Sequence, residues 1–281
     1  MKIFGTAAAQ RRNPDVITDL NAAKIAYERD GYLIYDFAFS DELLSQAEQI
    51  TASIPKSYVR TQDLWRVNAS AKSLAISPEV LTLLGGLYER RAFPFQTLNF
   101  RVGTQQATHA DSLHFSSVPE NFMCGVWVAL EDIDMENGPL HYFKGSHKRP
   151  TATMQDIQRQ SGGVVDQFFA QAHKPYEKEY GLIKRGQAVI WAANLLHGGD
   201  PIIDQTRTRL SQVTHYFFDD CYYVTPINNI SGSAEYIRHP YDISQNKFIW
   251  GRRNGKIVRP HIKSFLGGYL KNILRQSASF E

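Results

Sequence analysis

The 281-residue sequence is poor in cysteine and contains no long apolar segment. Its two cysteines, Cys124 and Cys221, form no C-x-x-C motif, which argues against a disulfide framework and against a thiolate metal site. No stretch approaches the roughly 18 consecutive apolar residues of a membrane-spanning helix. The beginning, MKIFGTAAAQRR, has too short an apolar run for a secretory signal. We therefore expect a cytoplasmic protein.

Low-complexity tracts and internal repeats are also absent from the sequence. Without a Ser-, Gly- or Pro-rich tract there is no sign of a flexible linker, and the lack of repeats argues against a propeller or a solenoid. We expect one domain over residues 1–281. It should have a helical part at about 15–90, a core at about 91–220 and a basic extension at about 221–281.

The first ninety residues carry helix signals. The segment 21–30 predicts a helix that ends at Gly31, and the apolar segment 32–37 that follows predicts a strand. Ser40 can cap a second helix, because acidic residues follow it in the first turn. Ser77, followed by proline, predicts the start of a third helix. The N-terminal part should therefore be mostly helical.

From about residue 91 onward, the sequence changes to short alternating segments: FPFQTLNFRV, FMCGVWVAL, PLHYF, QAVIWAAN and TRLSQVTHYFF. Several short strands without intervening helices favour an antiparallel sandwich or jelly roll over a parallel sheet. We interpret Glu136-Asn137-Gly138 as a hairpin turn between two of these strands.

The segment THADSLHF contains the one H-x-D motif of the chain. Because residues i and i+2 of a strand point the same way, His109 and Asp111 can converge on one metal ion. His197 is the candidate third ligand, since it ends an apolar strand and precedes two glycines. Two imidazoles and a carboxylate form a facial triad that leaves three coordination sites open. Taken singly, each histidine could equally be a hydrogen-bonded structural side chain.

Arg209 lies in an alternating segment, on the same face as Arg207, Ser211 and Val213. A guanidinium inside a β-barrel is costly unless an anion pairs with it. A small dicarboxylate that also chelates the metal would satisfy Arg209. Arg207 is the second choice for this role, and we expect it to line the rim.

Four segments together resemble the phytanoyl-CoA dioxygenase family of Fe(II)- and 2-oxoglutarate-dependent oxygenases. They are GYLIYDFAFSDELL, THAD, GVWVALEDIDMENGPLHYFKGSHK and LLHGGDPIIDQTRTRLSQVTHYF, and the resemblance covers roughly residues 25–220. It implies a mainly β fold, a double-stranded β-helix (a cupin-like jelly roll) with N-terminal and C-terminal helices packed on it. It also implies Fe(II), 2-oxoglutarate and O2 as the cofactor and cosubstrates.

The resemblance implies roles for five residues. His109, Asp111 and His197 match the metal ligands of the family. Arg209 matches the arginine that binds the distal carboxylate of 2-oxoglutarate, and Trp127 matches an aromatic residue that borders this cosubstrate. For Trp127, plain core packing is the alternative interpretation.

The sequence departs from the family pattern at two positions. Ala110 stands where many relatives carry glutamine, and Gly199 stands where a hydroxyl-bearing residue often follows the last histidine ligand by two positions. One hydrogen bond to the cosubstrate is therefore in question. Asp111 is present, whereas halogenating relatives carry a small residue there, so we do not expect halogenation.

These observations predict a dioxygenase that hydroxylates an unactivated C–H bond of a small metabolite and releases succinate and CO2. Desaturation, epimerisation or cyclisation by the same chemistry is one alternative, and a non-catalytic jelly-roll ligand-binding protein is another. His114 and Arg101 are candidate substrate contacts at the pocket mouth. We expect His215 to pack in the barrel wall.

The basic extension carries eight basic residues and one acid between residues 247 and 281. This suggests an anionic substrate. Within it, HIKSFLGGYLKNILRQ predicts an amphipathic helix, but such a stripe usually packs on its own domain. We expect a small-molecule substrate as the partner, with no nucleic acid and no membrane surface. The sequence does not predict an oligomeric state.

Overall fold

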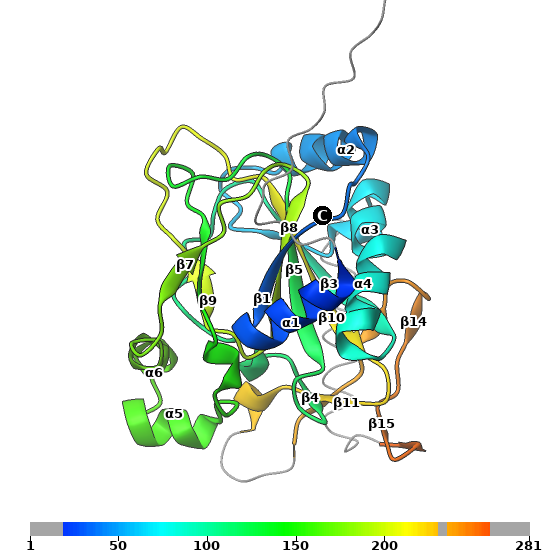
Figure 1. The fold of residues 1–281 in the computed structure, drawn as a ribbon, viewed down its shortest axis with the longest axis vertical. Coiled ribbons are helices and arrows are strands. Elements are labelled where there is room, and N and C mark those ends of the chain that lie inside the picture. The colour runs from blue at the N-terminus through cyan, green and yellow to red at the C-terminus, as the bar shows by residue number, and fades with distance from the viewer. Residues whose placement is uncertain (1–18, 230–234, 259–281) are drawn as a thin grey trace, which may run out of the picture.

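A computed structural model of the protein describes residues 19–229 and 235–258. Figure 1 shows two sheets that face each other, with a layer of helices on the outer side of the larger sheet. The six-stranded sheet has the order β1 (Tyr32–Asp36), β8 (Gln187–Ala192), β5 (Met123–Ala129), β10 (Ser211–Phe218), β3 (Ala92–Phe100) and β2 (Thr61–Gln62). The sheet opposite it has the order β7 (Lys178–Tyr180), β6 (Leu140–Phe143) and β9 (His197–Gly199). All these neighbouring strands pair antiparallel.

Smaller elements close the lower end of the fold as seen in Figure 1. A third sheet has the order β12 (Ile237–Arg238), β11 (Tyr222–Val224) and β4 (Ser116–Val118). Two further strand pairs follow it in the chain: β13 (Tyr241–Asp242) with β14 (Lys247–Phe248), and β15 (Arg252–Arg253) with β16 (Lys256–Ile257). The predicted mainly β jelly roll is confirmed.

The alternation of side chains along β5 explains why the large sheet is covered on both faces. Cys124, Val126 and Val128 pack into the core beneath the N-terminal helices. Trp127 and Ala129 point to the opposite face, into the core between the two sheets. Because successive residues of a strand face opposite ways, one apolar strand supplies both cores.

The predicted N-terminal helices are confirmed. Figure 1 shows them on the outer face of the large sheet: α1 (Leu20–Asp30), α2 (Asp41–Ala52), α3 (Ala69–Ala75) and α4 (Pro78–Tyr88). Asp19 caps α1, and the Ser40 hydroxyl accepts a hydrogen bond from the Leu43 N–H at the start of α2. Gly31 ends α1 with φ +82°, a left-handed conformation that favours glycine.

Two features of the fold differ from the sequence prediction. The helices α5 (Met154–Ser161) and α6 (Val165–Ala172) lie between β6 and β7, where we expected only strands. The hairpin prediction for residues 136–138 is also wrong, because the strands on either side, β5 and β6, belong to different sheets. Asn137 is buried there and donates hydrogen bonds to the carbonyls of Asp132 and Thr208, so this segment connects the sheets.

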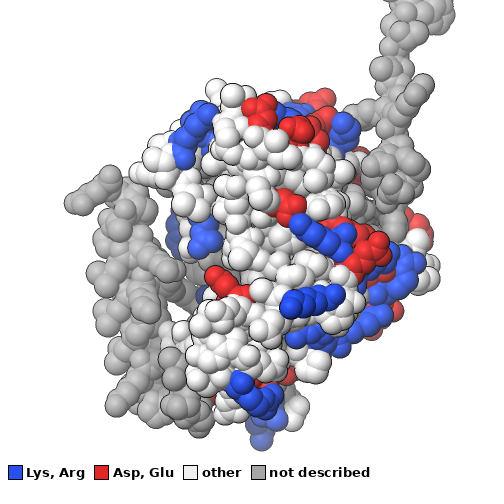
Figure 2. All heavy atoms as spheres, turned by 90° about the vertical axis from the view of Figure 1, so that its left-hand side faces the viewer, with Lys and Arg blue, Asp and Glu red and all other residues white. Residues whose placement is uncertain are grey.

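The C-terminal part is only partly described. Residues 235–258 form the short strands β12 to β16, and the predicted amphipathic helix at 261–276 lies outside the described residues. Within the described ranges, no helix combines the length and the apolar character needed to cross a membrane. Figure 2 shows one face of the molecule, on which basic and acidic side chains are interspersed and neither sign forms a continuous field.

The close packing at Gly31 generates a stability prediction. A Cβ atom at Gly31 would lie 2.3 Å from Nδ1 of His147, whereas at Gly162, which ends α5 with φ +60°, it would meet nothing within 4 Å. Gly162→Ala should therefore cost only the left-handed conformation, about 1 kcal/mol. Gly31→Ala should cost about 1–3 kcal/mol more, because of overpacking. Urea unfolding of both variants measures the difference, and equal losses would contradict the packing described here.

Candidate metal centre

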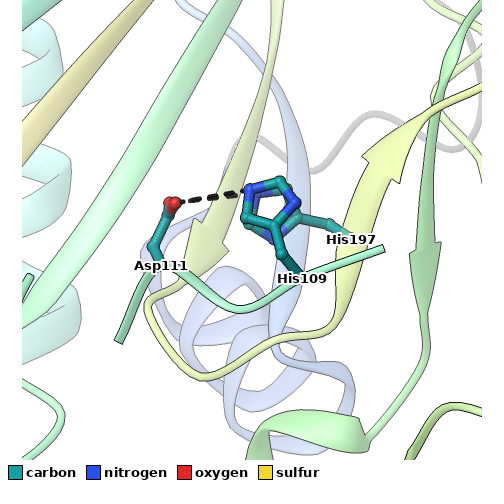
Figure 3. A group of neighbouring side chains, drawn as sticks. All are labelled: His109, Asp111 and His197. Carbon is teal, nitrogen blue, oxygen red and sulfur yellow. Dashed lines mark ion pairs between the residues drawn. The ribbon is translucent and has the colours of Figure 1, made fainter. Parts of the chain in front are cut away.

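Two histidines that are distant in the sequence are joined by the backbone. The His109 N–H donates to the His197 carbonyl at 2.9 Å, and the His197 N–H donates to the His109 carbonyl at 3.0 Å. This isolated antiparallel bridge places the two imidazole rings with their centroids 4.4 Å apart. Figure 3 shows both rings on the same side of the Asp111 carboxylate. The predicted convergence of these three residues is therefore present in the structure.

The secondary structure at Asp111 differs from the predicted strand. It begins a 3-10 helix, η2 (Asp111–Leu113), and so does not continue a strand. The residue before it, Ala110, is extended, with φ −126° and ψ 132°. One extended residue suffices to place the side chains on either side of it on the same face. The spacing argument holds although the strand assignment does not.

The three side chains form a compact group with one ligand atom each, which we call the His–Asp–His group (His109, Asp111 and His197). These atoms all lie within 4.8 Å of one another. The Nε2 atom of His109 is 3.7 Å from one Asp111 carboxylate oxygen, and the Nε2 atom of His197 is 3.8 Å from the other. The group is buried, apart from partial exposure of His109.

Backbone hydrogen bonds fix the tautomer of both imidazoles. Nδ1 of His109 lies 2.9 Å from the Ala107 carbonyl, and Nδ1 of His197 lies 2.9 Å from the Leu195 carbonyl. Since a carbonyl can only accept, both Nδ1 atoms carry a proton, and in the neutral imidazole the lone pair is then on Nε2. A hydrogen bond of this kind orients the ring of a metal-binding histidine.

Burial and neighbouring charge set the protonation states of the group. Burial, together with the nearby His109, lowers the pKa of His197 to about 4, so its imidazole is neutral at neutral pH. Burial alone would raise the pKa of Asp111, but the imidazoles of His197, His109 and His215 outweigh it and hold this pKa well below its usual range. The neutral His197 imidazole and the Asp111 carboxylate are in the protonation states that a divalent cation requires of its ligands. The donor set fits Fe(II) in particular.

Trp191 holds the aspartate in place. Its indole N–H donates to Asp111 Oδ2 at 2.8 Å. The indole can lie there because Gly125 is its partner on the neighbouring strand, and a Cβ atom at Gly125 would come within 2.3 Å of the ring. The pair Gly125–Trp191 thus supports the carboxylate from the sheet behind it.

Arg209 is buried just before β10, with 2% of its surface exposed. Its Nη1 donates to the Gly138 carbonyl at 2.9 Å, and its Cζ lies 5.5 Å from the Trp127 ring. Burial, only partly offset by Glu131, lowers its pKa to about 10, so it stays charged at neutral pH. Nε of Arg209 and Nε1 of Trp127 are buried and have no hydrogen-bond partner among the described residues. The buried guanidinium and the neighbouring indole thus each keep one N–H group available for hydrogen bonding.

One cavity of about 550 Å³ connects these features. Its lining includes the His–Asp–His group, Trp127 and Arg209. The predicted substrate contact His114 also lines it, whereas Arg101 does not belong to its lining and instead donates to the Ile54 carbonyl. Arg207 is not at the rim either, because it pairs with Asp134 at 2.8 Å and 2.9 Å. Arg209 therefore lines the cavity, and Arg207 does not.

Sequence reasoning missed three residues of this cavity. His215 is buried in β10 as expected, but it lines the cavity, and its Nε2 lies 3.6 Å from Asp111 Oδ2. The two-residue period that starts at Arg209 continues to His215, so this signal was available. Trp191 could not be told apart from an ordinary core tryptophan. Thr104 lines the cavity and offers a hydroxyl that Gly199 lacks.

A jelly roll that carries a 2-His-1-carboxylate group on its inner side is an arrangement of non-haem iron oxygenases. The phytanoyl-CoA dioxygenase family model matches residues 62–208, which is just over half of the chain. The chain therefore belongs to this family, as its motifs predicted.

Comparisons with individual proteins agree with this assignment. The peroxisomal phytanoyl-CoA dioxygenase of Rattus norvegicus is 30% identical over 122 residues, which are 42% of this chain and 35% of the rat protein. The match thus spans about a third of that relative. The epimerase SnoN, solved in complex with Fe3+, alpha ketoglutarate and nogalamycin RO, superposes with a TM-score of 0.62 at 18% identity, covering 82% of this chain and 97% of SnoN. EctD from S. alaskensis with bound Fe gives a TM-score of 0.63 at 16% identity, covering 86% and 89%. At these identities the two structures show a shared fold.

The hydrogen bond from Trp191 to Asp111 generates a prediction about metal affinity. Trp191→Phe keeps most of the packing but removes the donor, so divalent metal binding should weaken about 10- to 100-fold. Trp65→Phe is the matched control, because the Trp65 indole N–H also donates to an aspartate, Asp63, outside the cavity. Anaerobic calorimetric titration with Fe(II) measures both variants. Equal metal affinity in Trp191→Phe and the wild type would show that the indole does not support the site.

Proposed function

We propose that this protein is an Fe(II)- and 2-oxoglutarate-dependent dioxygenase that hydroxylates an unactivated C–H bond of a small metabolite. In the balanced reaction, 2-oxoglutarate, O2 and the C–H compound give succinate, CO2 and the alcohol. The observation that carries the proposal is that the His–Asp–His group and the buried Arg209 open into one cavity. Membership of the phytanoyl-CoA dioxygenase family supports it.

The residues of the chain divide the work. His109, Asp111 and His197 hold the metal through two neutral imidazoles and one carboxylate. The bound iron supplies the activation of O2, which no amino-acid side chain provides. Arg209 binds the distal carboxylate of 2-oxoglutarate, and that anion compensates a buried guanidinium that forms no ion pair with the described carboxylates. Trp127 forms the wall beside this carboxylate and keeps water away from it.

Burial of Arg209 makes this recognition specific. A guanidinium removed from water binds an anion more strongly than an exposed one, because the local dielectric is low. Its Nη1 is already bonded to the Gly138 carbonyl, so the side chain is oriented before the cosubstrate arrives. A keto acid of the right length can then reach both the guanidinium and the metal. Shorter keto acids should lose one of the two contacts.

Hydroxylation is the outcome we propose. Solved structures with this fold also include enzymes that are described with other outcomes. EctD was solved with 2-oxoglutarate and 5-hydroxyectoine, a hydroxylated compound. SnoN is described as an epimerase and SnoK as a carbocyclase, both alpha ketoglutarate dependent. These outcomes share the cosubstrate chemistry and diverge on the substrate. The positions that line the cavity beyond the metal decide among them.

The test is 2-oxoglutarate turnover, with Arg209 as the variable. Arg209→Ala should raise the KM for 2-oxoglutarate at least 10-fold, because a charge-assisted hydrogen-bond pair to a carboxylate is lost. Arg207→Ala is the matched control, because Arg207 pairs with Asp134 outside the cavity, and its KM should not change. Succinate formation is measured with and without Fe(II), and His109→Ala serves as the blank.

Two results would contradict the proposal. Iron-loaded, folded protein that forms no succinate across a broad metabolite panel would favour a non-catalytic binding protein. An unchanged KM in Arg209→Ala would show that 2-oxoglutarate binds elsewhere.

A further inference from the structure

Four hydrogen-bonded side chains lie behind the metal centre, and none of the four belongs to the lining of the cavity. Nζ of Lys178 donates to both carboxylate oxygens of Asp200, at 2.7 Å and 3.0 Å. Nδ1 of His141 lies 2.6 Å from Oδ1 of Asp200, and Nε2 of His141 lies 2.9 Å from Oγ1 of Thr108. We call these four residues the His141 network. It ends at Thr108, the residue just before the metal ligand His109.

The network crosses strand β9. His141 on β6 is the partner of Gly198 on β9, and β9 is bridged on its other side to His109. A Cβ atom at Gly198 would lie 2.8 Å from both Cε1 and Nε2 of the His141 ring. The ring therefore passes over Gly198 on its way to Thr108. The glycine leaves the space that this ring needs.

The hydrogen bonds of His141 have a defined direction. The Asp200 carboxylate, paired with Lys178, accepts, so Nδ1 of His141 carries a proton. Burial lowers the pKa of His141, and in the neutral ring Nε2 accepts from the Thr108 hydroxyl. Only 6% of the surface of His141 is exposed. A hydrogen bond shielded from water in this way is stronger than an exposed one.

The two histidine ligands differ in how firmly the chain before them is packed. His197 lies in β9, and residues 195–196 before it are fully buried. Residues 105–107 before His109 are exposed. The segment that carries His109 therefore has less packing to hold it in place, and the bond from Thr108 to His141 adds an anchor from the small sheet.

The anchor acts on the peptide group that orients the His109 ring. Nδ1 of His109 donates to the Ala107 carbonyl, and this carbonyl belongs to the peptide group that joins Ala107 to Thr108. Holding the Thr108 side chain restricts the rotation of that peptide group. The direction of the His109 ring is then fixed together with its acceptor.

We propose that His141 and Asp200 are positioning residues for the metal, which act on its ligand His109 through the hydroxyl of Thr108. This inference rests on the metal site of the proposed function and adds residues outside the cavity to it. Loss of the bond between Thr108 and His141 should leave the backbone bridge at His109 in place. It should weaken the hydrogen bond that orients the ring, and with it the bond to the metal.

The first test measures the affinity of the whole protein for Co(II), used as a spectroscopic substitute for Fe(II). Thr108→Val keeps the size of the side chain but removes the hydroxyl, so the affinity should fall about 10-fold. Thr108→Ser retains a hydroxyl and should restore most of the affinity. Thr151→Val is the matched control, because the Thr151 hydroxyl donates to Glu120 outside the cavity, and it should match the wild type.

The second test separates positioning from a general loss of stability. In the Co(II) protein, each coordinated histidine gives one strongly shifted N–H resonance in the proton NMR spectrum. In Thr108→Val, one of the two N–H groups should exchange with water at least 10-fold faster, and the other should exchange at the wild-type rate. The unchanged resonance also shows that the variant is folded.

Two variants of His141 test the route of the effect. In His141→Asn the amide takes the place of Nδ1 and can still donate to Asp200, but it does not reach Thr108. In His141→Gln the amide takes the place of Nε2 and can contact Thr108. His141→Asn should therefore behave like Thr108→Val, and His141→Gln should retain more of the Co(II) affinity.

The outcomes separate this inference from the proposed function. Wild-type Co(II) affinity and N–H exchange in Thr108→Val would overturn the inference and leave the oxygenase proposal intact. Equal acceleration of both N–H groups would also overturn it, because the effect would then not be specific to one ligand. Wild-type protein that binds no Co(II) would overturn both proposals. The predicted effects of Thr108→Val in a protein that forms no succinate would support the inference and contradict the proposed function.

Discussion

The candidate site depends on one backbone pairing, the reciprocal hydrogen bonds between His109 and His197. These bonds bring two remote segments into contact and set the spacing of the two rings. The same backbone also fixes both tautomers, because each Nδ1 donates to the carbonyl two residues before it. Position and tautomer of the two imidazoles therefore follow from main-chain geometry. The third donor, Asp111, needs a side chain, since the Trp191 indole holds it.

The two faces of the large sheet have different tasks. The outer face is an apolar core beneath the N-terminal helices and positions the strands. The inner face lines the candidate site, and β10 runs along it, with Arg209 just before its first residue and His215 near its middle. Glu131 offsets the energetic cost of the buried Arg209 only in part, and a bound anion would offset more of it, which would couple the stability of this region to ligand binding.

The sequence predicted the parts of the site that depend on local geometry or on the family motifs, and it failed where a role depends on the register between strands. The H-x-D spacing worked because Ala110 is extended, although the strand around it is not formed. The role of Trp191 depends on its register opposite Gly125 on another strand, and a single apolar segment does not contain that information. His215 could have been found by extending the two-residue period that starts at Arg209. The helix α5 carries a local signal that sequence reasoning passed over, because Thr153 and Asp156 form a capping box at its start, whereas the loop between the sheets depends on a partner far along the chain.

The most direct test of the central claim is a crystal structure of the protein grown anaerobically with Fe(II) and 2-oxoglutarate, with iron located by anomalous scattering. Our account predicts one iron peak within coordination distance of Nε2 of His109, Nε2 of His197 and a carboxylate oxygen of Asp111. It also predicts that the far carboxylate of 2-oxoglutarate contacts the guanidinium of Arg209. Iron at another position, or a cavity without 2-oxoglutarate between the metal and Arg209, would contradict it.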